Sequence, residues 1–214
     1  MYDPFPHNFI FWEPVENHQE IKQIYLEKIK QREHLITKPE VWNCDVLSSF
    51  ECQQINNEIF DEYFHQNVIW KACDKLLQSI PFNFDVPSSS SVLNVWFNTY
   101  KKGQYQEIHN HLWSGSNLLI LSNERAQNIV GLLSGIYILH SEETNKTVFY
   151  QEGMNPFDRT KMGSNFNGTY GIKKTTEEIK EGNVILFPSS LSHYTVPAEK
   201  SRTIISFNIV SRYD

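Results

Sequence analysis

Apolar residues in the first third of the chain recur with the spacing of helices. From Asn17 to Glu33 they stand among charged neighbours with the period of an amphipathic helix, which Asn17 is placed to cap. They are Ile21, Ile24, Tyr25 and Ile29. A second helical region is predicted from Ser49 to Ile80, where Pro81 ends it. The pattern therefore predicts a helical N-terminal support region over residues 1–84.

The pattern changes after the turn-rich stretch Asp85 to Ser91, DVPSSSS. Short runs of β-branched and aromatic residues follow, which are typical of strands. The runs are Val92–Tyr100, Gln104–His111, Asn117–Ser122, Val130–Leu139, Thr147–Gln151, Asn183–Phe187 and Arg202–Val210. Seven short strands favour a sandwich or barrel, so we expect a mainly β core over residues 92–214 and one α+β domain over residues 1–214. The polar stretch Gly153 to Tyr170 is interpreted as a long loop, either a lid or a disordered insertion.

Composition excludes several classes of partner. The net charge of −6, from 19 basic and 25 acidic residues, gives no basic surface for nucleic acid. No apolar run reaches the length of a membrane span, and the acidic, proline-containing N-terminus does not resemble a signal peptide. Three cysteines, an odd number, favour a reducing compartment, so a cytoplasmic protein is expected. The oligomeric state stays open, a homodimer included.

Three histidines form the candidate metal site. Residues two apart on a strand point to the same face, so His109 and His111 can approach one metal ion. The segment EGNVILFP, Glu181 to Pro188, predicts a turn and a buried strand, and His193 follows shortly after it. Non-haem iron(II) needs two or three ligands on one side, which leaves neighbouring positions for a chelating co-substrate and O2. His109, His111 and His193 are therefore the predicted metal-binding and catalytic residues.

Arg202 is the candidate anchor for that co-substrate. It lies nine residues beyond His193 and opens the strand RTIISFN. 2-Oxoglutarate chelates iron through its keto acid end, and its other carboxylate needs a buried cation, best supplied by the bidentate fork of an arginine. The alternative interpretation of Arg202 is a surface residue paired with a nearby carboxylate.

Strand parity adds candidate cavity residues. Trp96, Asn98 and Tyr100 share a face with Asn94, and Asn98 or Tyr100 could bind the co-substrate. Ser206 and Asn208 share parity with Arg202 and could contact 2-oxoglutarate or the substrate. We exclude Tyr137 from the site, because its parity is opposite to that of its strand neighbours Ser134 and Ile138.

Four stretches resemble the 2-oxoglutarate- and iron(II)-dependent oxygenases related to prolyl 4-hydroxylases, in particular a branch from marine bacteria and their phages. They are LNVWFNTYKKGQYQEIHNH from Leu93, LSGIYIL from Leu133, EGNVILFPSSLSHYTVP from Glu181 and SRTIISFN from Ser201. The resemblance implies a double-stranded β-helix (a cupin-like jelly roll) buttressed by the first helices. It also implies that His109 and His193 bind iron and that Arg202 anchors 2-oxoglutarate.

One feature departs from the wider superfamily, which has H-x-D or H-x-E where this chain has His111. Glu107 shares the predicted strand face and is the rival third ligand. The leading hypothesis is an oxygenase that uses Fe(II), 2-oxoglutarate and O2, releases succinate and CO2, and acts on an unknown small-molecule or peptidyl substrate. The alternatives are a cupin-like metalloenzyme without 2-oxoglutarate and a non-enzymatic jelly-roll binding or virion protein.

Overall fold

The computed structural model describes residues 9–36, 38–39, 42–79, 91–111, 129–144, 146–150, 172–173 and 178–212. Three features predicted from the sequence lie outside these residues: the strand Asn117–Ser122, the loop Gly153–Tyr170 and the helix-ending Pro81. Within the described part, the helices precede the main run of strands, as predicted. None of the described helices is long and apolar enough to cross a membrane.

The first predicted helix is present as α1 (His18–Arg32). Its buried residues Ile21, Tyr25 and Ile29 are spaced by four positions, and that spacing brings them to one side of a helix. Asn17 stands at the predicted N-cap position, and its carbonyl oxygen accepts a hydrogen bond from the Ile21 backbone N–H; however, its backbone is left-handed with φ 54° and its side chain makes no capping hydrogen bond. A short 3₁₀ turn, η1 (Glu33–Leu35), follows α1.

The second predicted helical region is helical in the structure but is broken into shorter segments. It contains α2 (Gln53–Ile59), α3 (Glu62–Phe64), the π-helical η2 (His65–Trp70) and α4 (Lys71–Ser79). The break falls at Asp61, whose carboxylate accepts a hydrogen bond of 3.2 Å from the Phe64 backbone N–H and so starts a new helix. An aspartate within a helical pattern thus acts as a cap between two helices.

The strands form two antiparallel sheets. The larger has the order β1-β8-β5-β10-β3-β2 and the smaller the order β4-β9-β6-β7. The strands of the larger sheet are β1 (Phe11–Pro14), β8 (Asn183–Pro188), β5 (Ile129–Ser141), β10 (Arg202–Arg212), β3 (Ser91–Tyr100) and β2 (Leu47–Ser48). Those of the smaller sheet are β4 (Gln106–His109), β9 (Ser192–Thr195), β6 (Thr147–Tyr150) and β7 (Ile172–Lys173). The strands β1 and β2, which the sequence did not predict, add edge strands from the N-terminal region to the larger sheet.

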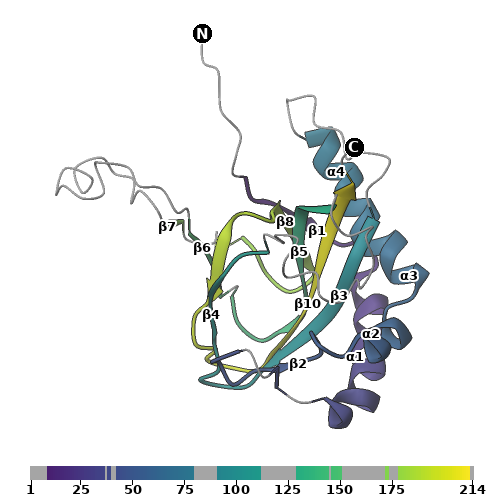
Figure 1. Cartoon of the computed structure of the whole chain (residues 1–214). Coiled ribbons are helices and arrows are strands. Elements are labelled where there is room, and N and C mark those ends of the chain that lie inside the picture. Colours follow the sequence, from purple (N-terminus) through teal and green to yellow (C-terminus); the bar gives the residue numbers. More distant parts are fainter. Residues whose placement is uncertain are drawn as a thin grey trace, which may run out of the picture.

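The larger sheet separates two apolar clusters. Helices α1 to α4 cover one of its faces, and the smaller sheet lies on the other side (Figure 1). The helix-facing cluster includes Phe207 and Tyr137, whose hydroxyl lies 2.6 Å from Nδ1 of His18. Tyr137 therefore lies on the helix side of the sheet, away from the second cluster, which contains Tyr100 and Phe187. The helices therefore pack against one face of the larger sheet, and the face toward the smaller sheet is available to form a site.

Candidate metal centre and co-substrate pocket

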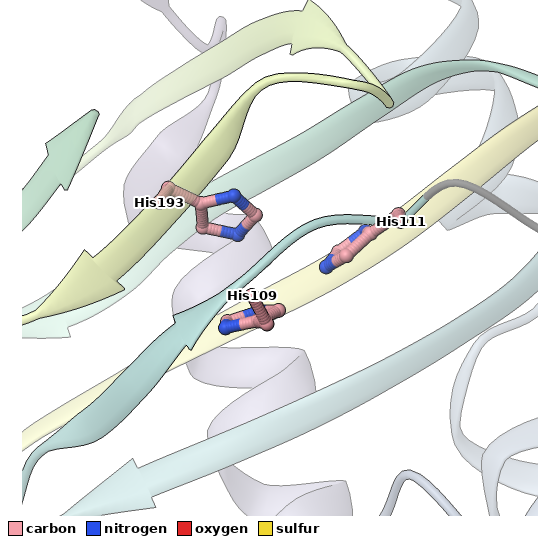
Figure 2. A group of neighbouring side chains, drawn as sticks. All are labelled: His109, His111 and His193. Carbon is pink, nitrogen blue, oxygen red and sulfur yellow. The ribbon is translucent and has the colours of Figure 1, made fainter. Parts of the chain in front are cut away.

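The three predicted histidines meet on the smaller sheet. His109 on β4 and His193 on β9 are cross-strand partners, and their ring centroids lie 4.3 Å apart. The His111 ring lies 5.2 Å from that of His109 and 5.0 Å from that of His193. One ligand atom from each residue lies within 4.8 Å of the others, and Figure 2 shows the three rings converging. This arrangement could hold one metal ion.

Hydrogen bonds direct the same nitrogen of each ring toward that centre. Nδ1 of His109 contacts the Glu107 carbonyl oxygen at 2.8 Å, and Nδ1 of His193 contacts the Leu191 carbonyl oxygen at 3.1 Å. A carbonyl oxygen only accepts, so both Nδ1 atoms carry the proton. Nδ1 of His111 lies 2.6 Å from Oδ1 of Asn208, which accepts in the same way. Each Nε2 therefore keeps its lone pair, which is the state that a metal ligand needs.

Burial keeps the three imidazoles neutral. Desolvation lowers the pKa of His109, and it lowers the pKa of His111 to about 3 with a further contribution from His109. The pKa of His193 lies well below its usual value because of burial and its two histidine neighbours. Protons therefore compete weakly with a metal ion for the three Nε2 atoms at neutral pH.

Arg202 is a buried cation without a paired anion. Arg202 is 2% exposed, and its Nε and Nη2 atoms have no hydrogen-bond partner among the described residues. No carboxylate oxygen in the described part of the chain lies within ion-pair distance of it, although the Glu143 charge is close enough to raise its pKa. The guanidinium carbon lies 4.3 Å from the centre of the Tyr100 ring. An unpaired buried cation is costly, so this group is suited to a bound carboxylate. The interpretation of Arg202 as a surface residue is therefore wrong.

Gln106 connects this arginine to the histidines, and the sequence analysis did not identify it. Its Oε1 accepts a hydrogen bond of 2.9 Å from the Tyr100 hydroxyl, and its Nε2 lies 3.5 Å from Nε2 of His109. The register of β4 against β9 shifts between Gln106 and His109, which brings two residues three apart into the same buried region. Strict alternation would place Gln106 and His109 on opposite faces of the strand, and no sequence signal marks this bulge.

Glu107 turns away from the metal centre. Its carboxylate accepts a hydrogen bond of 3.0 Å from the Asn43 backbone N–H, and the Cys44 thiol lies beside it. Burial would raise the pKa of Glu107, but these hydrogen bonds outweigh it and lower the pKa. Because the bulge breaks the alternation that placed Glu107 beside His109, the geometry favours His111 over Glu107 as the third ligand.

The strands β3 and β10 pair with each other, which brings the remaining candidates into one row. On β3 and β10 the cross-strand pairs are Tyr100 with Arg202, Asn98 with Ile204, Trp96 with Ser206, and Asn94 with Asn208. This row runs from the arginine to the His111 side. Its member Asn98 is 1% exposed, and its Oδ1 has no partner in the described part of the chain. Contacts of Asn98 and Ser206 with 2-oxoglutarate stay predictions. Asn208 already binds His111 through its oxygen.

Three neutral imidazoles could hold one metal ion, and a buried arginine beside them could bind the carboxylate of a chelating co-substrate. A family described as "Putative 2OG-Fe(II) oxygenase" matches residues 94–208, more than half of the chain. The chain therefore belongs to this family of 2-oxoglutarate- and iron(II)-dependent oxygenases, as the resemblance implied. The matched region contains the three histidines and Arg202. No curated protein matches the chain by sequence.

Solved structures share the fold at low sequence identity. The viral collagen prolyl hydroxylase of Paramecium bursaria Chlorella virus-1, in its 2-oxoglutarate complex, has a TM-score of 0.54 and 14% identity, covering 97% of each chain. A Trichoplax adhaerens prolyl hydroxylase, bound to a hypoxia inducible factor peptide, has a TM-score of 0.55 and 11% identity, covering 94% of this chain and 83% of that one. HygX from Streptomyces hygroscopicus, with nickel and 2-oxoglutarate bound, has a TM-score of 0.54 and 10% identity, covering 97% and 84%. These likenesses confirm the predicted double-stranded β-helix.

Proposed function

We propose that His109, His111 and His193 hold the iron through their Nε2 atoms, and that Arg202 binds the distal carboxylate of 2-oxoglutarate. The observation that carries this proposal is the set of three Nδ1 hydrogen bonds, which leaves three convergent lone pairs. Iron(II) with bound 2-oxoglutarate activates O2 and couples release of succinate and CO2 to oxidation of a substrate.

The protein residues supply placement and a dry cavity. The fork of Arg202 has two nitrogens, Nε and Nη2, without a partner among the described residues, and Tyr100 lies against its face and limits its rotation. Tyr100 and Gln106 lie between the arginine and His109, so they could orient the co-substrate along this line. Apolar side chains between the sheets, among them Ile136 and Phe187, exclude water from this region.

A row of aromatic residues extends from the metal centre on the His111 side. The Trp96 ring lies 5.7 Å from His111, Phe50 lies 5.1 Å from Trp96, and Trp42 lies 5.6 Å from Phe50. The buried indole N–H of Trp96 has no partner among the described residues. This row is suited to a substrate with an apolar body and a hydrogen-bond acceptor, either a small molecule or a peptidyl group. The neighbours named above include proteins bound to a peptide and to 2-oxoglutarate.

We also propose that the protein works in the cytoplasm. Cys44, Cys52 and Cys73 are free thiols in the structure, which is the state that a reducing compartment maintains.

The test of this function is anaerobic binding. Iron(II) and 2-oxoglutarate added together to the metal-free protein should give a weak visible charge-transfer band that neither produces alone. His193→Ala should abolish the band, whereas Thr203→Ala on β10 should keep it, because Thr203 contacts Thr99 and none of the three histidines. No band at saturating iron and 2-oxoglutarate would contradict the proposal.

A further inference from the structure

His111 lies outside the strand that carries His109. The strand β4 ends at His109, so the sheet ladder does not hold His111 in place. Instead the His111 backbone N–H donates a hydrogen bond of 2.9 Å to the Ser189 carbonyl oxygen, in the turn after β8. This bond fixes the backbone but leaves the ring free to rotate about its side-chain bonds. The direction of Nε2 must therefore be set by a contact of the ring itself.

Asn208 on β10 supplies that contact. Its Oδ1 accepts hydrogen bonds from Nδ1 of His111 at 2.6 Å and from Oγ of Ser134 at 2.8 Å. Its Nδ2 donates to Oδ1 of Asn94 at 3.0 Å, which fixes the face that the amide presents to the histidine. Asn208 is 1% exposed, so water does not compete for these bonds.

Ser189 connects the two ends of His111. Its carbonyl oxygen holds the His111 backbone, and its hydroxyl lies 3.0 Å from Oγ of Ser134. Because Ser134 donates to Asn208, its oxygen is free to accept from Ser189. The chain of hydrogen bonds runs from Ser189 through Ser134 and Asn208 to the ring, so backbone and ring share one support.

We propose that Asn208 is a positioning residue that holds His111 in the Nδ1–H tautomer and turns its Nε2 toward the metal. The inference rests on the proposed function, and it gives Asn208 a role other than the co-substrate contact predicted from strand parity. A carboxylate ligand has no tautomers to choose between. A histidine in this position binds metal through Nε2 when its proton is on Nδ1, and an acceptor facing Nδ1 favours that tautomer. The neutral amide provides that acceptor without adding charge.

The first experiment records long-range ¹H–¹⁵N NMR spectra of the metal-free protein. In the wild type, His111 should carry its proton on Nδ1. In Asn208→Ala the acceptor is gone, so His111 should populate the Nε2–H tautomer, and Asn208→Asp should restore the Nδ1–H form. A wild-type His111 protonated on Nε2 would overturn the inference without the need for any variant.

The second experiment titrates the same proteins with cobalt(II). Asn208→Ala should weaken cobalt binding by about 10- to 100-fold, the usual cost of removing a partner of a metal-bound histidine. Asn208→Asp keeps the acceptor for Nδ1 but loses the donor to Asn94, so it should bind cobalt more tightly than Asn208→Ala and less tightly than the wild type. Thr203→Ala is the matched control. It removes a hydroxyl from the same strand as Asn208, where that hydroxyl contacts Thr99 of β3, and it should leave the affinity unchanged.

The outcomes separate the two proposals. If the wild type binds neither cobalt(II) nor iron(II), the proposed function fails. If the wild type binds metal and Asn208→Ala binds it equally well with an unchanged His111 tautomer, only the role of Asn208 fails. Should Asn208→Ala not fold, Ser134→Ala removes one donor to the amide oxygen and should weaken cobalt binding by a few-fold; unchanged affinity there would count against the inference.

Discussion

The guanidinium carbon of Arg202 lies 4.3 Å from the centre of the Tyr100 ring, with which it pairs across β10 and β3. Desolvation lowers the pKa of Arg202 from its usual value, but an arginine stays charged at neutral pH. The stacked ring stabilises this cation and leaves its edge for hydrogen bonds. A buried cation that is supported by an aromatic face and forms no ion pair among the described residues is suited to binding a carboxylate.

Arg202→Met should weaken 2-oxoglutarate binding and leave metal binding unchanged. Methionine keeps much of the packing against Tyr100 but removes the charged fork, which should cost about 100-fold in affinity, or roughly 3 kcal/mol. Calorimetric titration of the protein loaded with iron(II) under anaerobic conditions measures this. Arg202→Lys is the matched comparison, and it should fall between the two because it keeps the charge without the bidentate geometry. Equal losses of metal and 2-oxoglutarate would contradict the assignment.

His111→Ala should abolish stoichiometric iron binding, whereas Glu107→Gln should retain it. The reason is geometric: His111 faces the other two histidines, and Glu107 binds the Asn43 backbone. The measurement is iron per protein after anaerobic loading and desalting. Glu107→Gln should instead lower thermal stability slightly, because a weaker acceptor then faces the Asn43 N–H. Retained iron in His111→Ala with loss in Glu107→Gln would reverse the two roles.

The inner face of the larger sheet could be predicted from the sequence. On the smaller sheet the histidines could be predicted, but the bulge in β4 and the orientations of Gln106 and Glu107 could not, for a physical reason. Along β3 and β10, regular alternation identified the residues that share a face, Trp96, Asn98 and Tyr100 on one strand and Arg202, Ser206 and Asn208 on the other; the pairing of the two strands comes from the structure. Such alternation depends only on local backbone geometry, so a sequence pattern reveals it.

The smaller sheet depends on contacts that no local pattern contains. A bulge in β4 brings Gln106 inward and turns Glu107 outward, and His111 is held by Ser189 and Asn208, which are distant in sequence. Similarly, the helical period was visible in the second helical region, but its break depends on Asp61 capping α3 and on hydrogen bonds from Tyr25 and Lys28 of α1. Long-range hydrogen bonds therefore determine the bulge, the position of His111 and the helix break, which the periodicity of the sequence does not predict.

Glu181 should make the free energy of unfolding depend on pH in the acidic range. Burial would raise the pKa of Glu181, but hydrogen bonds from Lys22, the Ser141 backbone and His18 outweigh it and lower the pKa to about 2 from its usual value near 4.5. Because the folded-state pKa is lowered, the stabilisation is complete above the unfolded value and is lost as the pH falls from 4.5 through 2. Because the carboxylate is partly exposed, solvent screening reduces this contribution to on the order of 1–2 kcal/mol.

Glu181→Gln measures this contribution. Urea unfolding should show the variant clearly less stable than the wild type at pH 6, with the difference shrinking as the pH falls toward 2. Glu58→Gln is the control, since Glu58 contacts Arg32 at the surface and should contribute less than about 1 kcal/mol. A difference between wild type and Glu181→Gln that does not change with pH would show that the carboxylate is not stabilised in the folded state.

Gly135→Ala should destabilise the fold without changing metal affinity. Gly135 on β5 is the cross-strand partner of Phe207 on β10, and an added Cβ would overlap the buried Phe207 ring. Overpacking of this kind costs about 1–3 kcal/mol, which should lower the melting temperature by several degrees. The contact belongs to the helix-facing cluster, on the other side of the sheet from the histidines, so cobalt(II) binding should persist. If the overlap is the cause, Phe207→Leu should make room, and the double variant should lose less stability than the two single variants added together. Strictly additive losses would show that Gly135 is needed for another reason.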